Sequence, residues 1–120
     1  MPHGPRFEKL AGEAKTRIKE TSAIEAAERQ SQGAILVDVR EGEEFSKNHA
    51  TNALHLSKGM IELKIEHQIP DPATPIICYC GGGNRSALVA DSLQKMGYEN
   101  VLSMTGGFKS WKDAGLPTES

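Results

Sequence analysis

Apolar residues follow two different patterns along this chain, and each pattern predicts a different kind of element. Short, unbroken apolar runs are typical of strands that are covered on both faces. Longer segments with an apolar residue every three or four positions are typical of helices that bury one side. The short runs predict four strands, at Ala34–Val37, Ala53–Leu56, Pro75–Cys80 and Val101–Met104.

Helical spacing, together with cap and stop residues, predicts five helices. Ser22 and Glu25 have the spacing of a capping box at the start of the second helix. Ser57 is placed to cap the third helix, and Gly97 to end the fourth. The expected helices are Arg6–Lys19, 23–31, Lys58–Gln68, Arg85–Met96 and Phe108–Ala114.

Two segments give weaker signals. Ile61, Leu63 and Ile65 alternate as in a strand, but no turn residue interrupts the segment before Pro70, which favours a helix. The stretch 48–52, Asn-His-Ala-Thr-Asn, predicts a turn.

Because strands alternate with helices, we expect an α/β fold. It has three layers, α/β/α, with a mostly parallel central sheet and helices on both faces. At 120 residues the chain fits one domain. We divide it into an N-terminal extension, 1–20, the domain itself, 21–117, and a tail, 118–120. The helix in the extension can either pack on the domain or serve as a surface for a partner.

Charge and composition exclude several classes of function. The net charge is -2, and the few aromatic residues are not interleaved with basic ones, which argues against a nucleic-acid partner. There is no apolar run long enough for a membrane span and no apolar core of a signal peptide near the start. We therefore expect a cytoplasmic protein without a membrane partner.

The chemistry concentrates at Pro75–Ser86, where an apolar strand ends at Cys80 and a helix begins shortly after it. Between them lie Gly81, Gly82, Gly83 and Asn84, followed by Arg85 and Ser86. Glycines allow successive backbone N–H groups to turn inward around an anion, and the start of a helix adds further free N–H groups. A cysteine in this position is suited to act as a thiolate or to carry a charged adduct.

The second cysteine, Cys78, has a different expected role. It would point to the same face of the strand as Cys80, but two positions along one strand is poor spacing for a disulfide. Two cysteines alone are too few for a structural zinc site, so we expect neither a metal nor a cofactor. Cys78 is interpreted as a small buried strand residue.

Sites in parallel sheets lie at the carboxyl ends of the strands. Cys80, Asp38 and Met104–Thr105 all fall at such ends in the predicted fold.

Four stretches together resemble the single-domain rhodaneses, a family of sulfurtransferases. The resemblance covers roughly 22–117. Its turn at 48–53 departs from the family pattern, although His49 matches the family histidine, which we interpret as structural. The stretches are Leu36–Glu41 with Glu44 and Phe45, the turn 48–53, Tyr79–Ser86, and Gly106–Phe108 with Trp111 and Gly115–Pro117.

The resemblance implies a rhodanese-like fold and a sulfurtransferase that accepts sulfane sulfur, from thiosulfate or another persulfide donor, on Cys80. The persulfide formed there would be held by the N–H groups of Gly81–Ser86 and then passed to a thiol or to cyanide. Four residues separate Cys80 from Arg85. Related phosphatases and arsenate reductases carry one more residue, so the resemblance favours sulfur.

The supporting charged residues leave alternatives open. Arg85 either meets the anionic donor or ties the loop to a carboxylate such as Asp38 or Glu44. Asp38 and Arg40 are expected to form structural ion pairs. Because the loop from Gly81 to Asn84 is uncharged, we predict modest activity with thiosulfate.

Two other functions remain as alternatives. One is a non-catalytic module that binds a partner or reports sulfur status, and the less favoured one is a phosphatase or arsenate reductase. The expected partners are a small-molecule or protein sulfur donor and a thiol acceptor, and the chain is expected to be a monomer or a weak homodimer.

Overall fold

The structure, a computed structural model, describes residues 3–120 and is built on one five-stranded sheet. All neighbouring strands in this sheet are parallel, in the order β1-β6-β5-β2-β4. The strands are β1 (Lys19–Thr21), β2 (Ile35–Asp38), β4 (Leu54–His55), β5 (Ile76–Tyr79) and β6 (Val101–Met104). β5, which leads to Cys80, is therefore the central strand.

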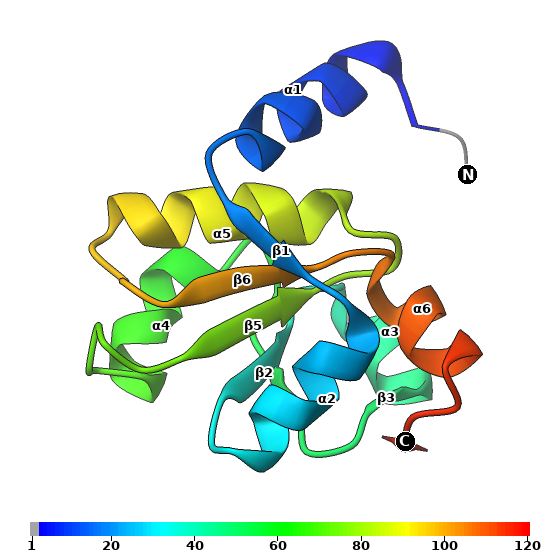
Figure 1. Cartoon of the computed structure of the whole chain (residues 1–120). Helices are drawn as coiled ribbons and strands as arrows, with labels where there is room; N and C mark the ends of the chain where they lie inside the picture. The colour runs from blue at the N-terminus through cyan, green and yellow to red at the C-terminus, as the bar shows by residue number, and fades with distance from the viewer. Residues whose placement is uncertain (1–2) are drawn as a thin grey trace.

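Helices cover both faces of the sheet, which confirms the predicted α/β/α layers (Figure 1). One face packs against α4 (Ile61–Gln68) and α5 (Asn84–Lys95), and the other packs against α2 (Ala23–Ser31) and α6 (Gly107–Asp113). A further helix, α1 (Pro5–Lys15), lies outside α5, on the side away from the sheet (Figure 1).

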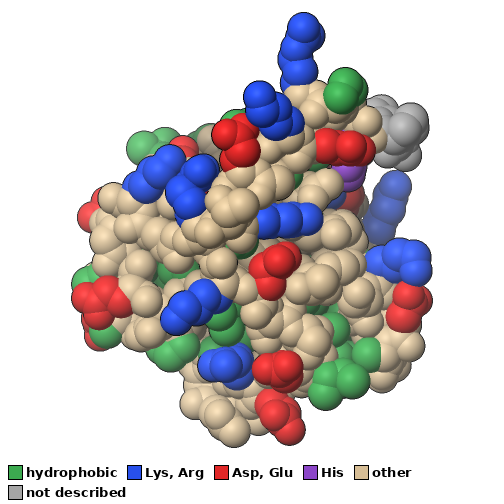
Figure 2. Space-filling view, turned by 45° about the horizontal axis from the view of Figure 1, so that its top comes forward, with side chains coloured by type: hydrophobic (Ala, Val, Ile, Leu, Met, Phe, Trp, Pro, Cys, Tyr) green, Lys and Arg blue, Asp and Glu red, His purple; other side chains and the backbone are tan. Residues whose placement is uncertain are grey.

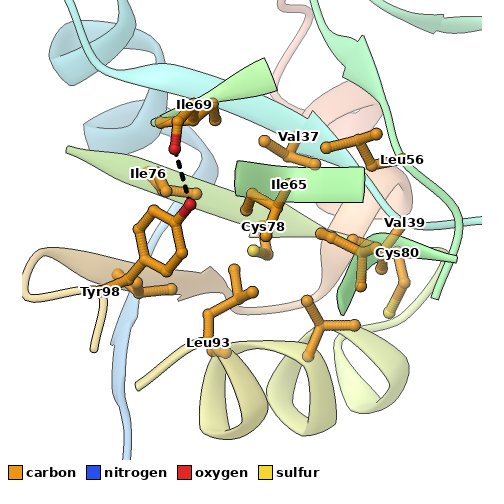
Figure 3. Close-up of a cluster of buried hydrophobic side chains, with 14 residues drawn as sticks. Val37, Val39, Leu56, Ile65, Ile69, Ile76, Cys78, Cys80, Leu93 and Tyr98 are labelled. Carbon is orange, nitrogen blue, oxygen red and sulfur yellow. Dashed lines mark hydrogen bonds between the residues drawn. The ribbon is translucent and has the colours of Figure 1, made fainter. Parts of the chain in front are cut away.

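The two faces of the sheet have separate apolar cores because successive strand residues point to opposite sides. On the α5 face, Cys78 and Cys80 lie in one cluster with Val39 and Leu93 (Figure 3). Tyr98 closes this cluster, and its hydroxyl donates to the backbone oxygen of Ile69 at 2.6 Å. The sulfur of Cys80 therefore lies at the carboxyl end of a packed core rather than in an open cleft.

Cap residues explain several of the helix boundaries. The Ser22 hydroxyl accepts from the Glu25 N–H at 3.1 Å, so the predicted N-cap of α2 is confirmed. Gly97, with φ 102°, follows the last turn of α5 as predicted. The predicted cap of the third helix is wrong. That helix begins at Ile61 after Met60, and Ser57 contributes only its backbone oxygen to the turn before it.

One helix boundary and two strand pairings differ from the sequence predictions. The first helix ends at Lys15 rather than Lys19, and Lys19–Thr21 form β1 beside β6. His49–Ala50, predicted as a turn, form β3, which pairs antiparallel with β7 at Thr118–Glu119, predicted as a tail. These strands are two or three residues long, so their own sequences carry no recognisable pattern. Whether such residues form a strand depends on pairing with segments that are distant in the chain.

The loop after β2 contains one further short helix, α3 (Gly42–Lys47). No helix within residues 3–120 has the length and apolar content to cross a membrane.

Candidate active site

Cys80 follows the last residue of β5 and is almost completely buried, with 1% of its surface exposed. The backbone N–H of Gly83 donates to its sulfur, with an N–Sγ distance of 3.0 Å. The hydroxyl of Ser86 lies 3.5 Å from the same sulfur. One backbone donor and one hydroxyl therefore converge on Sγ, which suits a sulfur that carries negative charge.

Gly83 shapes the loop that brings these donors together. It lies directly before α5 with φ 106°, a backbone conformation that L side chains rarely adopt. The left-handed turn lets the chain reverse from strand to helix within four residues, so the free N–H groups of the first turn of α5 face the end of β5. Gly82 is the exposed residue of this loop.

The start of α6 supports the loop from behind. The Phe108 N–H donates to the Cys80 backbone oxygen at 2.7 Å, and the Lys109 N–H donates to that of Gly81 at 3.3 Å. Gly107, with φ 55°, packs so closely that a Cβ there would collide with the Cys80 oxygen and lie 2.8 Å from the carbonyl of Gly81. Glycine is therefore required at 107 because the two backbones meet there without a side chain between them.

A second hydroxyl lies behind Ser86. The Oγ atoms of Ser86 and Ser103 are 2.8 Å apart, and both residues are fully buried. Ser103 is not among the site residues that the sequence pattern predicts, although a serine inside an apolar strand is a signal that could have indicated it. When Cys80 is a thiolate, Ser103 can donate to Ser86 and Ser86 to the sulfur, which uses both hydroxyl hydrogens.

Arg85 forms a two-bond ion pair with Glu44. Its Nη1 and Nη2 donate to the two carboxylate oxygens at 2.9 and 3.1 Å. These bonds lower the pKa of Glu44 to about 2, and the Glu41 backbone N–H also bonds to this carboxylate. Arg85 was expected either to meet the anionic donor or to tie the loop to a carboxylate. The structure has the second arrangement, an ion pair that ties the loop to α3.

Asp38 and Arg40 form the buried ion pair that the sequence predicted. The Arg40 Nη2 donates to the Asp38 carboxylate at 2.8 Å and to the Asn48 backbone oxygen at 2.7 Å. The guanidinium carbon of Arg40 also lies 4.4 Å from the centre of the Phe108 ring. This pair therefore fixes the loop after β2 against the start of α6.

His49 also has structural contacts. Its Nδ1 lies 2.8 Å from the backbone oxygen of Phe45, and its ring stacks on that of Phe45 with centroids 3.7 Å apart.

Asn84, the first residue of α5, connects the end of the loop to the N-terminal segment that contains α1. Its Oδ1 accepts from the Lys15 Nζ at 2.8 Å, and its Nδ2 lies 3.0 Å from the His3 Nδ1. Nothing in the sequence pattern indicated this contact, because it depends on where α1 packs.

The two cysteines have different surroundings. Cys78 is fully buried in the core, and burial raises the pKa of its thiol to about 12. This agrees with the interpretation of Cys78 as an inert strand residue. The structure thus brings Cys80, the glycine loop, Asn84 and Ser86 together at one end of the sheet, whereas Asp38, Arg40 and Arg85 brace this group from outside.

A cavity of about 460 Å³ lies elsewhere. It opens at the amino ends of the strands, where Pro75, Ile76 and Val101 line it, so it is at the opposite end of the sheet from Cys80. No group of three His, Cys, Asp or Glu side chains is arranged to hold a metal within residues 3–120.

At the carboxyl end of the parallel sheet, a buried cysteine is followed by a glycine loop and by the first residues of a helix. This arrangement defines the class of rhodanese-fold proteins. The rhodanese-like domain family matches residues 22–114, and the chain belongs to this family.

Among curated proteins, the thiosulfate sulfurtransferase GlpE of Haemophilus influenzae (strain PittEE) is 42% identical over 103 residues. The match covers 86% of this chain and 96% of that protein. GlpE of Coxiella burnetii (strain RSA 331 / Henzerling II) is 36% identical over 95 residues, covering 78% of this chain and 87% of that protein.

Two solved structures resemble the chain over nearly its whole length. RPA3614 of Rhodopseudomonas palustris CGA009, a protein of unknown function named as a possible tyrosine phosphatase, has a TM-score of 0.83 at 30% identity and covers 99% of both chains. The polysulfide-sulfur transferase homodimer of Wolinella succinogenes has a TM-score of 0.81 at 25% identity. That match covers 95% of this chain and 87% of the Wolinella chain.

Proposed function

We propose that this protein is a rhodanese-type sulfurtransferase that carries sulfane sulfur as a persulfide on Cys80. The observation that carries the proposal is the Cys80 sulfur held 3.0 Å from the Gly83 N–H in an uncharged glycine loop. The names of the GlpE relatives support the same reaction class.

In the first half of the reaction, the Cys80 thiolate attacks the outer sulfur of a donor such as thiosulfate. A Cys–S–S bond forms and the donor's S–S bond breaks. The bonding electron pair leaves with sulfite, so the terminal sulfur on Cys80 keeps one negative charge. N–H groups of Gly81–Ser86 hold that sulfur, each through a charge-assisted bond worth roughly 1.5–3 kcal/mol.

In the second half, a thiolate or cyanide attacks the terminal sulfur and the Cys80 thiolate leaves. Negative charge returns to Sγ, where the Gly83 N–H and the Ser86 hydroxyl stabilise it. The Ser103 hydroxyl is in turn hydrogen-bonded to that of Ser86. This is covalent catalysis in two steps, each with a stabilised sulfur anion as leaving group or product.

The loop length separates this function from phosphoryl transfer. Four residues lie between Cys80 and Arg85. Arg85, the cation nearest in sequence, is bonded to Glu44 through both terminal nitrogens. A tetrahedral oxyanion needs a wider cradle and a free cation, so we rank a phosphatase, the activity suggested in the name of RPA3614, below sulfur transfer.

Intact mass before and after reductant tests the proposal. Incubation with thiosulfate is expected to add one sulfur, about 32 Da, that reductant removes. The adduct should vanish in Cys80→Ser and persist in the matched variant Cys78→Ser. No adduct with any donor would favour the non-catalytic binding module, and hydrolysis of an aryl phosphate that depends on Cys80 would favour the phosphatase.

Three further features belong to the proposal. A reducing compartment such as the cytoplasm suits a reaction that needs Cys80 as a free thiol. The partners are a small-molecule or protein donor and a thiol acceptor, without nucleic acid or membrane. The chain acts as a monomer or weak homodimer, which sedimentation analysis can test.

A further inference from the structure

Both arginines close to the Cys80 loop are already neutralised. Arg85 bonds to both oxygens of Glu44, and Arg40 bonds to both oxygens of Asp38. A cation whose donors are fixed on a carboxylate has little net field left for an approaching anion. Neither arginine therefore explains how an anionic sulfur donor would be attracted to an uncharged loop.

Lys15 is the cation that touches the loop without such a partner. Its Nζ donates to the side-chain oxygen of Asn84 at 2.8 Å, and no carboxylate of residues 3–120 lies within 4.0 Å of it. Asn84 follows Gly83, whose N–H bonds the Cys80 sulfur. Lys15 thus places an unneutralised positive charge beside the loop, one residue along the chain from the donor to Sγ.

Helix α1 is fixed well enough to hold this charge in place. Ala11 and Ala14 are buried in its contact with α5, where small side chains allow close packing. Just after the helix, Arg17 forms two bonds to the Asp91 carboxylate at 3.0 and 2.7 Å, and Gln94 donates to the Arg17 backbone oxygen.

The position of Lys15 matters because the surrounding surface is mixed in charge. Figure 2, which looks onto the side where α1 lies, shows Lys and Arg side chains scattered among Asp and Glu rather than gathered in one basic patch. The net charge of -2 gives no general attraction for anions either. An anion would therefore respond to one nearby lysine and not to the whole face.

We propose that Lys15 is a specificity-determining residue that recognises small, doubly anionic sulfur donors of the thiosulfate class, with Asn84 holding its ammonium group beside the loop. The N-terminal helix, which lies outside the residues matched to the family, is then a part of the substrate site. This inference rests on the proposed sulfurtransferase function.

Electrostatic attraction makes a quantitative prediction. The Coulomb energy between Lys15 and a donor is proportional to the donor's charge. Removal of the Lys15 charge should therefore change the logarithm of the rate constant twice as much for a dianion as for a monoanion. Thiosulfate and methanethiosulfonate present the same reacting sulfur with charges of two and one. We expect Lys15→Gln to slow persulfide formation about 4-fold with thiosulfate and about 2-fold with methanethiosulfonate at low ionic strength.

The test measures the second-order rate of persulfide formation with both donors, over a range of salt concentrations. Lys9→Gln, a change of the same charge at an exposed position of the same helix, is the matched control and should leave both rates unchanged. Lys15→Arg should keep most of the wild-type rates because it keeps the charge. The effect of Lys15→Gln should fade as salt screens it.

The outcomes separate this inference from the function on which it rests. Wild-type protein that forms no persulfide with either donor would overturn the function. Persulfide formation with equal rates in wild type, Lys15→Gln and Lys9→Gln would overturn the role of Lys15 and leave the function standing. An equal slowing with both donors that salt does not change would mean that Lys15 is only structural.

Discussion

Gly107→Ala is the substitution for which the structure gives the sharpest prediction. The new Cβ would collide with the Cys80 backbone oxygen and lie 2.8 Å from the carbonyl atoms of Gly81. Both contacts are backbone, so no flexible side chain can move aside. Either α6 or the Cys80 loop must shift, and the bond from the Phe108 N–H to Cys80, 2.7 Å long, would be lost or lengthened.

The expected cost has two parts. An alanine at φ 55° costs about 1 kcal/mol in backbone strain. Forcing an extra methyl group into a packed site adds roughly 1–3 kcal/mol. The total, about 2–4 kcal/mol, should lower Tm by roughly 10–20 °C, and the displaced loop should form persulfide at least about 10-fold more slowly.

Gly115→Ala is the control for backbone strain alone. Gly115 has φ 72° at the other end of α6, and nothing lies within 4 Å of a Cβ built on it. The Gly115→Ala variant should lose only about 1 kcal/mol of its free energy of unfolding and keep the wild-type rate of persulfide formation. Thermal unfolding and the mass assay with thiosulfate measure both quantities. Equal stability and equal activity in the two variants would refute the claim that α6 positions the loop by direct backbone contact.

Three more predictions concern the residues around the loop. The Arg85 bonds hold the pKa of Glu44 at about 2, below its ordinary 4.5, so the pair stabilises the fold above pH 4.5 and this contribution is lost as the pH falls toward 2. Glu44→Gln should therefore lower Tm at pH 7 by an amount equivalent to about 1 kcal/mol or less, since the pair is partly exposed, and should match wild type near pH 2. Ser103→Ala removes the partner of Ser86; it should cost about 1–2 kcal/mol in urea unfolding and slow sulfur release to a thiol acceptor, and unchanged release would contradict a role for the hydroxyl pair. Because burial raises the pKa of Cys78 to about 12, iodoacetamide at pH 8 should add at most one label to the native chain and two in denaturant, as read by intact mass.

The sequence was sufficient to predict the parts of the fold that depend on local signals. The apolar runs at β2, β5 and β6 have apolar side chains on both faces of the sheet, so both faces must be covered by helices. The order of strands and helices followed from these runs. The capping box at Ser22 marked the start of α2 within one residue. The position of Cys80 at the end of the central strand followed from that order.

The remaining parts depend on contacts between distant segments. Arg85 had two acidic candidates, and the choice of Glu44 was settled only because Asp38 is already paired with Arg40. Ser103 meets Ser86 because β6 lies beside β5 and α5 covers that face. Sequence patterns carry no information about such distances, and the same holds for the contact between Lys15 and Asn84.

The strand β1 has a consequence for solubility and for shortened versions of the protein. It is three residues long, carries Lys19 and Glu20 exposed at the sheet edge, and occupies the hydrogen-bonding side of β6 that would otherwise be open. Open edges of apolar strands pair readily with other chains, and short, charged edge strands prevent this. A fragment trimmed to the family boundary at residue 22 would expose β6 along its length, so we expect it to self-associate more readily than the longer chain.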